Sequence, residues 1–476
     1  MKRIFLYIAM IWLAALAACS DEESFTTNPS ARLSFSVDTV LLDTVFSGVG
    51  SSTYTFWVYN QNHDGIRLSS VRLCQGNQTG FRVNVDGTFL DNQTGAVARD
   101  MEVRQGDSLR VFVELTAPEH GEAEARLTED DLEFTLESGL VQRVNLRAFS
   151  LNALKWNDKV ISRDTLIESA LPILVYGGLR VDSSATLTIR NTQIYFHDGA
   201  GIDVYGRLVT DGVLLRGDRL DHMFDYLPYD RVSGQWRGVR FHSSSTGNVL
   251  ERTEIRSAMQ GVVCDSVQFN SSSQRLYMGQ CTVHNCRGEG LLAYNSYVGL
   301  YDCQFSNTEG DCVAVYGGAA VMLYCTIAQF YPFASGRGAA LRFANYKGET
   351  AYPLYAMNCG NTLITGYDAD VVMGESRDST VLFDYYFYHC LLRTPSVADT
   401  TRFEQIIWET PDDSIQGKAH FRLIDEQNLS YDFRLDSLST ARGMALPVTG
   451  FNTDRNGIRR KERPDIGCYE FIAPAE

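Results

Sequence analysis

The sequence is poor in proline, has no excess of basic residues, and lacks the short motifs of several enzyme classes. Eleven prolines among 476 residues exclude a proline-rich or collagen-like chain. With 42 basic and 58 acidic residues the formal net charge is −16, so no nucleic-acid partner is expected, because phosphate binding needs a basic surface. The eight histidines form no HxH, HxxxH or HExxH spacing, and no P-loop, GxSxG or dinucleotide-binding motif occurs. The sequence therefore predicts no metal site and no cofactor of these classes.

Residues 1–18 have the pattern of a bacterial signal peptide. Two basic residues precede the apolar run 4–16, which is too short to span a bilayer. Leu16-Ala-Ala-Cys19 resembles a lipobox, whose cysteine is lipidated, and an ordinary secretory signal with a chance cysteine is the alternative. The acidic run 20–23 resembles the export signal of surface lipoproteins in Bacteroidetes-type bacteria, or it is a solvated linker. We expect an outer-membrane protein that is lipid-anchored at Cys19 and faces the cell exterior.

Two strand patterns follow a tether at 19–30. From 31 to 150, about eight short alternating strands, such as Tyr54-Thr-Phe-Trp-Val-Tyr59, are typical of an Ig-like β-sandwich. From 151 to 395, short strands recur at a regular period, and Cys281, Cys303 and Cys325 are each 22 residues apart. A fixed period of this length indicates a solenoid whose coils share one core.

Aligning the repeats places three strands in each coil. One column of the alignment is Thr192, Gly212, Thr253, Cys281, Cys303, Cys325, Thr362 and Cys390, and the column two residues later runs from Ile194 and Leu214 to Leu392. Three stacked parallel strands per coil, with small residues at the corners, predict a parallel β-helix. In this column Cys281, Cys303 and Cys325 are expected to stack inward as free thiols. Coils about 4.8 Å apart are too distant for a disulfide, although an exported protein would favour bridges.

The repeats resemble the right-handed parallel β-helix repeat proteins found in secreted and surface proteins of bacteria. The most specific segments are 172–181, 185–196 and 235–241. The region 396–476, with Thr453-Asp-Arg-Asn-Gly457 and Asp465-Ile-Gly-Cys-Tyr-Glu-Phe471, resembles the closing segment of such proteins and is expected to pack on the β-helix. The resemblance implies an all-β fold but no single function, because this architecture carries lyases, hydrolases, adhesins and inert scaffolds.

The outward positions of the third strand do not form the site that a β-helix enzyme of known type would need. A hydrolase needs two or three clustered carboxylates, and a lyase needs a basic residue beside a Ca²⁺ ion or other cation that neutralises the sugar carboxylate. The middle of the outward row is instead apolar, which suggests that an insertion (about 216–235, 329–337 or 344–357), the N-terminal domain or a partner covers it. The row is Asp203, Arg240, Val263, Leu292, Ala314, Arg342 and Val372.

Two sets of residues are candidates for a functional site. Glu254, Arg256 and His284 occupy outward positions of adjacent coils, where they are either catalytic groups or a salt-bridge ladder. A basic and aromatic set around the loop 344–357 either binds a glycan by stacking and ion pairing or is a solvated loop with packing tyrosines. This second set consists of Arg240, Arg342, Tyr346, Lys347, Tyr352 and Tyr355.

We therefore predict a surface lipoprotein whose β-helix binds a polysaccharide or another surface partner without catalysing a reaction. The alternative is a polysaccharide lyase or glycoside hydrolase on the same scaffold, and Ca²⁺ is expected only for a lyase.

Overall fold

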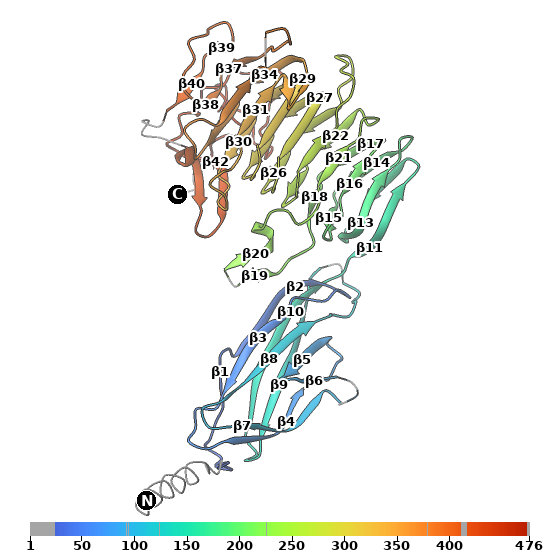
Figure 1. The fold of residues 1–476 in the computed structure, drawn as a ribbon, viewed down its shortest axis with the longest axis vertical. Helices are drawn as coiled ribbons and strands as arrows, with labels where there is room; N and C mark the ends of the chain where they lie inside the picture. Colours follow the sequence, from blue (N-terminus) through green and yellow to red (C-terminus); the bar gives the residue numbers. More distant parts are fainter. Residues whose placement is uncertain are drawn as a thin grey trace, which may run out of the picture. The chain divides into compact units, whose positions relative to one another are not determined.

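The computed structural model describes residues 24–473 except 92, 94, 123, 225, 378 and 411–416. Cys19 and the predicted leader lie outside these described residues. The chain divides into two compact units, Met1–Asn152 and Ala153–Glu476. Both are built from β-strands (Figure 1), as the sequence predicts. Within the described residues, no helix has the length and hydropathy needed to cross a bilayer.

The N-terminal unit consists of two five-stranded sheets that share one hydrophobic core. Inward apolar residues alternate with outward polar residues along the strands, and the inward residues form the core. In β5 (Phe81–Val85), Phe81, Val83 and Val85 are fully buried while Arg82 is exposed. In sheet order, the first sheet contains β1 (Ser34–Phe35), β3 (Tyr54–Tyr59), β8 (Ser108–Leu115), β5 and β6 (Thr88–Leu90), and the second contains β2 (Thr39–Phe46), β10 (Val141–Leu151), β9 (Arg126–Leu136), β4 (Ile66–Leu73) and β7 (Val97–Val103).

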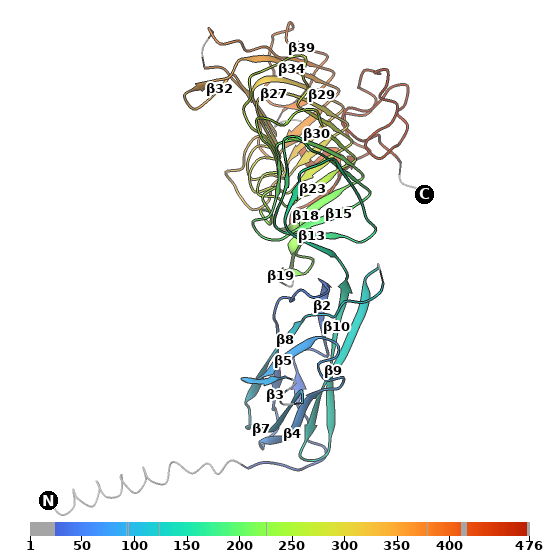
Figure 2. The ribbon, with the colours of Figure 1, turned by 90° about the vertical axis from the view of Figure 1, so that its right-hand side faces the viewer.

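The second unit is a parallel β-helix whose 26 strands pair from coil to coil. We call its three faces A, B and C. In the view of Figure 2 the coils lie one behind the other, and the C-terminal residues run along one side of them.

Face A contains β12 (Thr165–Glu168), β14 (Thr186–Arg190), β17 (Arg207–Asp211), β22 (Asn248–Glu251), β25 (Leu276–Gly279), β34 (Leu354–Gly360), β37 (Tyr386–Tyr388) and β39 (Phe403–Glu404). Face B contains β15 (Gln193–Phe196), β18 (Leu214–Gly217), β23 (Glu254–Arg256), β26 (Thr282–His284), β28 (Gln304–Ser306), β30 (Thr326–Gln329), β35 (Leu363–Gly366), β38 (Leu391–Arg393) and β40 (Ile407–Glu409). Face C contains β16 (Ile202–Val204), β21 (Val239–Phe241), β24 (Val262–Cys264), β31 (Leu341–Ala344) and β36 (Val372–Glu375).

Four longer strands bend from one face to the next, and the remaining elements lie outside the coils. The bent strands are β11 (Leu154–Ile161), β13 (Ile173–Val181), β27 (Leu291–Tyr301) and β29 (Val313–Leu323). The outer elements are the hairpins β19 (His222–Phe224)–β20 (Leu227–Pro228), β32 (Tyr346–Lys347)–β33 (Thr350–Ala351) and β41 (Phe421–Asp425)–β42 (Ser430–Leu435), and the short 3₁₀ helices η1 (Tyr229–Arg231) and η2 (Gly417–His420).

The observed register corrects the sequence alignment in one coil. Ile194 pairs with Leu215 and Leu215 with Ile255, so the first column contains Val213 where Gly212 was expected, and the next contains Leu215 rather than Leu214. Gly212 instead occupies the corner, with φ +66°. The hydrophobic pattern gives the wrong register here because this coil has a threonine, and not an apolar residue, at an inward position. The buried hydroxyl of Thr210 is hydrogen-bonded at 2.7 Å to that of Thr253.

A second one-residue slip occurs on face C. Arg342 pairs with Met373, and Val372 pairs with the buried Leu341, so the outward residue of this coil is Met373 and not Val372. The adjacent residues Val371 and Val372 fit either register by hydrophobicity, which explains the error.

The cysteine column lies inside the β-helix. Cys281, Cys303 and Cys325 are buried, free and in adjacent coils, with the Cys281 thiol donating to the carbonyl of Leu250 at 3.2 Å. Burial raises the pKa of the Cys281 and Cys325 thiols well above the usual value.

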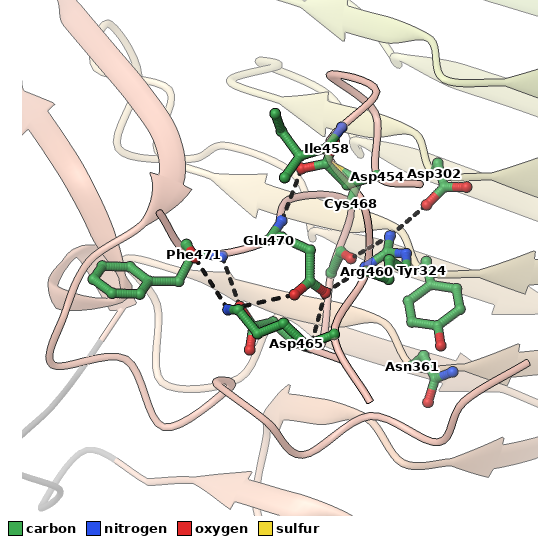
Figure 3. A network of polar contacts seen from close by, with 12 residues as sticks. Asp302, Tyr324, Asn361, Asp454, Ile458, Arg460, Asp465, Cys468, Glu470 and Phe471 are labelled. Carbon is green, nitrogen blue, oxygen red and sulfur yellow. Dashed lines mark hydrogen bonds and ion pairs between the residues drawn. The ribbon is translucent and has the colours of Figure 1, made fainter. Parts of the chain in front are cut away.

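The C-terminal motif quoted above forms a buried polar network against faces A and B (Figure 3). The guanidinium of Arg460 pairs with Asp302 and, at 3.1 Å, with Glu470, and it lies 3.8 Å from the centre of the Tyr324 ring. Backbone bonds tie this network to the coils, since the Gly467 N–H donates to the carbonyl of Asn361 at 2.8 Å. The acidic residues of the motif therefore stabilise the packing of the C-terminal segment on the β-helix. The segment covers the part of faces A and B that it contacts.

Candidate functional site

A cleft of about 530 Å³ lies on face B, where the C-terminal region crosses the outer surface of β23, β26 and β28. The hairpin strand β42 forms another wall, close to β26 and β30 in Figure 1. The insertions near 230 and 332 also contribute. Segments that are about 200 residues apart in sequence therefore meet at one site, because each insertion returns to the same face of the solenoid.

All three of the first candidate residues line this cleft. Arg256 and His284 are neighbours in the strand pairing, and the guanidinium of Arg256 forms an ion pair with Glu254. His284 Nδ1 is 2.9 Å from the hydroxyl of Ser306, which is fully buried and fixes the imidazole ring. Burial, together with the nearby Arg256, lowers the pKa of His284 to about 3, so this histidine is neutral at pH 7. Glu254 is thus engaged by a cation, and His284 is a weak base.

Three further residues of the cleft have polar atoms without a hydrogen-bond partner among the described residues. They are both side-chain polar atoms of Asn307, the hydroxyl of Tyr431 and Nε of Arg455. Only 1% of Asn307 is exposed. None of the three is recognisable as a site residue from the sequence, because Asn307 follows a strand at a corner and Arg455 belongs to a motif that resembles only a closing segment.

One wall of the cleft is aromatic. Phe333, from the insertion 329–337, is 50% exposed and lines the cleft. Tyr431 and Phe433 on β42 are stacked with nearly parallel rings whose centroids are 6.0 Å apart, and each is in an edge-to-face arrangement with His284. An exposed ring beside unpaired polar groups is the combination that holds a sugar, whose faces are apolar and whose rim carries hydroxyls.

The second candidate set is not gathered into one site. Arg240 and Arg342 are separated by four coil-to-coil steps, roughly 19 Å at the usual strand spacing. Each of these arginines is already paired: Arg240 with Asp265 at 2.8 Å, and Arg342 with Asp311 at 2.7 Å.

The loop residues of this set pack on the protein itself. Tyr346 and Tyr352 contact the buried cluster of Val263, Leu292, Ala314, Tyr316 and Ala344, so the 344–357 insertion helps to cover the apolar row of face C. Lys347 Nζ lies 2.7 Å from the hydroxyl of Tyr316, and Tyr355 is stacked on Phe269 at 4.4 Å. The contacts of this loop therefore agree better with tyrosines that pack on the protein than with an open surface for a glycan.

A charged cluster on face C was also missed by sequence reasoning. His242 Nε2 lies 2.9 Å from Asp203 and its Nδ1 lies 3.4 Å from Asp265. Arg237 and Arg240 pair with the same two carboxylates, so the charges of this cluster are mutually satisfied. Across the described residues, no group of three or more His, Cys, Asp or Glu side chains has the geometry to hold a metal ion.

Comparison with known proteins identifies the fold of the second unit. Residues 158–328 match the family model described as "Right handed beta helix region". This match supports the predicted right-handed β-helix. No curated protein matches the sequence.

Solved structures give only distant similarities. The catalytic domain of a GH87 α-1,3-glucanase in complex with nigerose covers 75% of this chain and 87% of its own, at 10% identity and a TM-score of 0.27. A family 123 glycoside hydrolase from Clostridium perfringens is 7% identical, with a TM-score of 0.18, over 27% of this chain and 31% of that one. The PapD-like domain 7 of human CEP192 is 14% identical over 27% of this chain and 90% of that one, with a TM-score of 0.18. TM-scores this low identify neither an activity nor a substrate for this chain.

Proposed function

We propose that this protein is a surface-anchored lipoprotein that binds a polysaccharide in the face B cleft without cleaving it. The observation that carries the proposal is the set of unpaired polar atoms on Asn307, Tyr431 and Arg455 in a cleft that also exposes Phe333. A buried polar group without a partner costs about 1–3 kcal/mol. A ligand that supplies the missing partners recovers this free energy on binding.

The same cleft favours binding over catalysis. Hydrolysis of a glycosidic bond requires an acid and a second carboxylate on opposite sides of the bond. Of the three carboxylates that line the cleft, Glu254 is held by Arg256 and Asp432 by Arg434, so that among the described residues only Asp230 lacks an ion pair and no second free carboxylate faces it. His284, with its lowered pKa, is a poor proton acceptor at neutral pH. We therefore rank the lyase or hydrolase alternative second.

The test is calorimetric titration of the protein with a panel of neutral and uronic-acid polysaccharides. We expect at least one of them to bind, and we expect Phe333→Ala to weaken binding roughly two- to tenfold through loss of ring stacking. Phe89→Ala is the matched control, because Phe89 is 44% exposed, belongs to the N-terminal unit and is not among the residues that line the cleft. Tyr355→Ala tests whether the loop 344–357 binds the polysaccharide instead.

Three results would overturn the proposal. They are no binding across the panel, loss of binding in Tyr355→Ala with Phe333→Ala unaffected, and cleavage of a bound polysaccharide. Cleavage is followed in the same samples by ultraviolet absorbance of unsaturated products and by new reducing ends.

A further inference from the structure

We propose that the ligand of the face B cleft is anionic, namely a polysaccharide that carries carboxylate groups, and that Arg455 and Asn307 bind one of these carboxylates. This inference rests on the proposed function, because it names the class of ligand for the same cleft.

The charges that line the cleft leave a positive excess in an acidic protein. Two ion pairs of the cleft contribute no net charge, because Arg256 pairs with Glu254 and Arg434 pairs with Asp432. The chain as a whole has a formal net charge of −16. A cationic cleft in such a chain concentrates anions locally. The charged side chains of the cleft, leaving out His284, which is neutral at pH 7, are Arg231, Arg256, Arg434 and Arg455 against Asp230, Glu254 and Asp432.

Arg455 forms no ion pair with the described residues, although Glu254 is near enough to raise its pKa. Among the described residues no carboxylate lies within ion-pair distance of its guanidinium, whose one side-chain hydrogen bond runs from Nη1 to Asn456 at 3.4 Å. Its Nε is buried and unpartnered, although the residue lines the cleft. A guanidinium presents its N–H groups in a fork that matches a carboxylate in two parallel hydrogen bonds. Arg455 therefore has both the charge and the free donor for such a pair.

Asn307 supplies a second donor next to the same space. It lies at a corner with φ +54°, where Asn285 in the preceding coil donates to Ser257 at 3.2 Å. Asn307 makes no such bond, and its buried amide nitrogen and oxygen have no hydrogen-bond partner in the part of the chain that the structure describes. The amide can donate to a carboxylate while its oxygen accepts from a sugar hydroxyl. The unpaired hydroxyl of Tyr431 offers a third donor.

A neutral sugar would satisfy the cleft less well. It could accept single hydrogen bonds from Asn307 and Tyr431, but it would leave Arg455 without an anion in a partly desolvated position. Because charge-assisted hydrogen bonds are about twice as strong as neutral ones, the two ligand classes should differ clearly in affinity.

The experiment compares uronic-acid polymers with their own methyl esters, which keep the chain and remove the charge. Polygalacturonate, alginate and hyaluronan are titrated into the full protein beside their esterified forms. We expect at least one acid form to bind at least about tenfold more tightly than its ester, with affinity that falls as salt rises. Arg455→Gln should abolish this preference, because the variant lacks the charge, whereas Arg455→Lys should retain part of it. Asn307→Ala should weaken binding of the acid form.

The outcomes separate this inference from the proposed function. Arg180→Gln is the matched control, because Arg180 is an exposed arginine paired with Asp182 on the same unit and lies outside the cleft. Circular dichroism and thermal melting confirm that each variant is folded. If esters or neutral polymers bind as tightly as acids, the ligand is not anionic, although the cleft still binds glycan. If no polymer binds, both proposals fail. Equal binding of dextran sulfate by wild type and Arg455→Gln, with no acid preference in either, would indicate nonspecific attraction and overturn the inference.

Discussion

Replacing Arg460 by methionine should strongly destabilise the β-helix unit. Arg460 is 8% exposed and neutralises both Asp302 and Glu470 in the network of Figure 3. Methionine fills a similar volume but leaves Asp302 without its cation, while Glu470 keeps Lys461 at 3.4 Å. Breaking a buried ion pair from one side costs about 3–5 kcal/mol. An exposed pair such as Arg180–Asp182 contributes at most about 1 kcal/mol, so Arg180→Met is the control.

The size of this effect should depend on pH. Burial raises the pKa of Asp302 to about 7, even though Arg460 opposes the shift. At about pH 5 the folded protein therefore holds Asp302 protonated, and a neutral carboxyl needs no counterion. The loss in Arg460→Met should accordingly be larger near pH 8 than near pH 5. Adding Asp302→Asn to Arg460→Met should recover more than half of the loss at pH 8.

Urea unfolding measures these differences in the free energy of unfolding. Tryptophan fluorescence reports on the second unit through Trp156, Trp236 and Trp408. The signal is made specific by replacing Trp57 with phenylalanine and by using the mature chain without the predicted signal peptide, which contains Trp12. If Arg460→Met loses no more stability than Arg180→Met at pH 8, or if Asp302→Asn fails to rescue Arg460→Met, then Arg460 does not stabilise the fold by neutralising Asp302.

Three further predictions concern Asp302 in the wild type, the cysteine column and the N-terminus. Because the folded pKa of Asp302 lies above its unfolded value, wild-type stability should fall as pH rises from about 4 through 7, by at most about 4 kcal/mol, and Asp302→Asn should flatten this slope in urea titrations. Thiol titration of the unfolded, unreduced protein should find Cys281, Cys303 and Cys325 free, and finding all three blocked would contradict the inward stack of free thiols. Mass spectrometry of the mature N-terminus should find a diacylated or triacylated Cys19, and Cys19→Ser should release the protein from membranes; an unmodified N-terminus at another residue would contradict the anchor.

The sequence predicts the β-helix well because small residues recur at the same core position of successive coils, even though insertions vary the length of the coils. Thr253, Cys281, Cys303, Cys325, Thr362 and Cys390 form one column in both the alignment and the strand pairing. The alignment fails where hydrophobicity does not identify the inward residue. Thr210 points inward and hydrogen-bonds to Thr253, and Val371 and Val372 fit either register.

The cleft could be predicted only in part. Glu254, Arg256 and His284 are recognisable because strand alternation places them outward on adjacent coils. Asn307 lies at a corner, and Arg455 reaches face B through a segment that folds back over many coils. No local spacing encodes that return, so the groups with unpaired atoms become visible only in three dimensions.

The most direct test of the account is hydrogen–deuterium exchange with and without the tightest-binding polysaccharide. The account predicts slower exchange in peptides covering 282–285, 304–307 and 429–434, with no change in 346–355. Protection confined to 346–355, or to the N-terminal unit, would contradict the assignment of the face B cleft as the binding site.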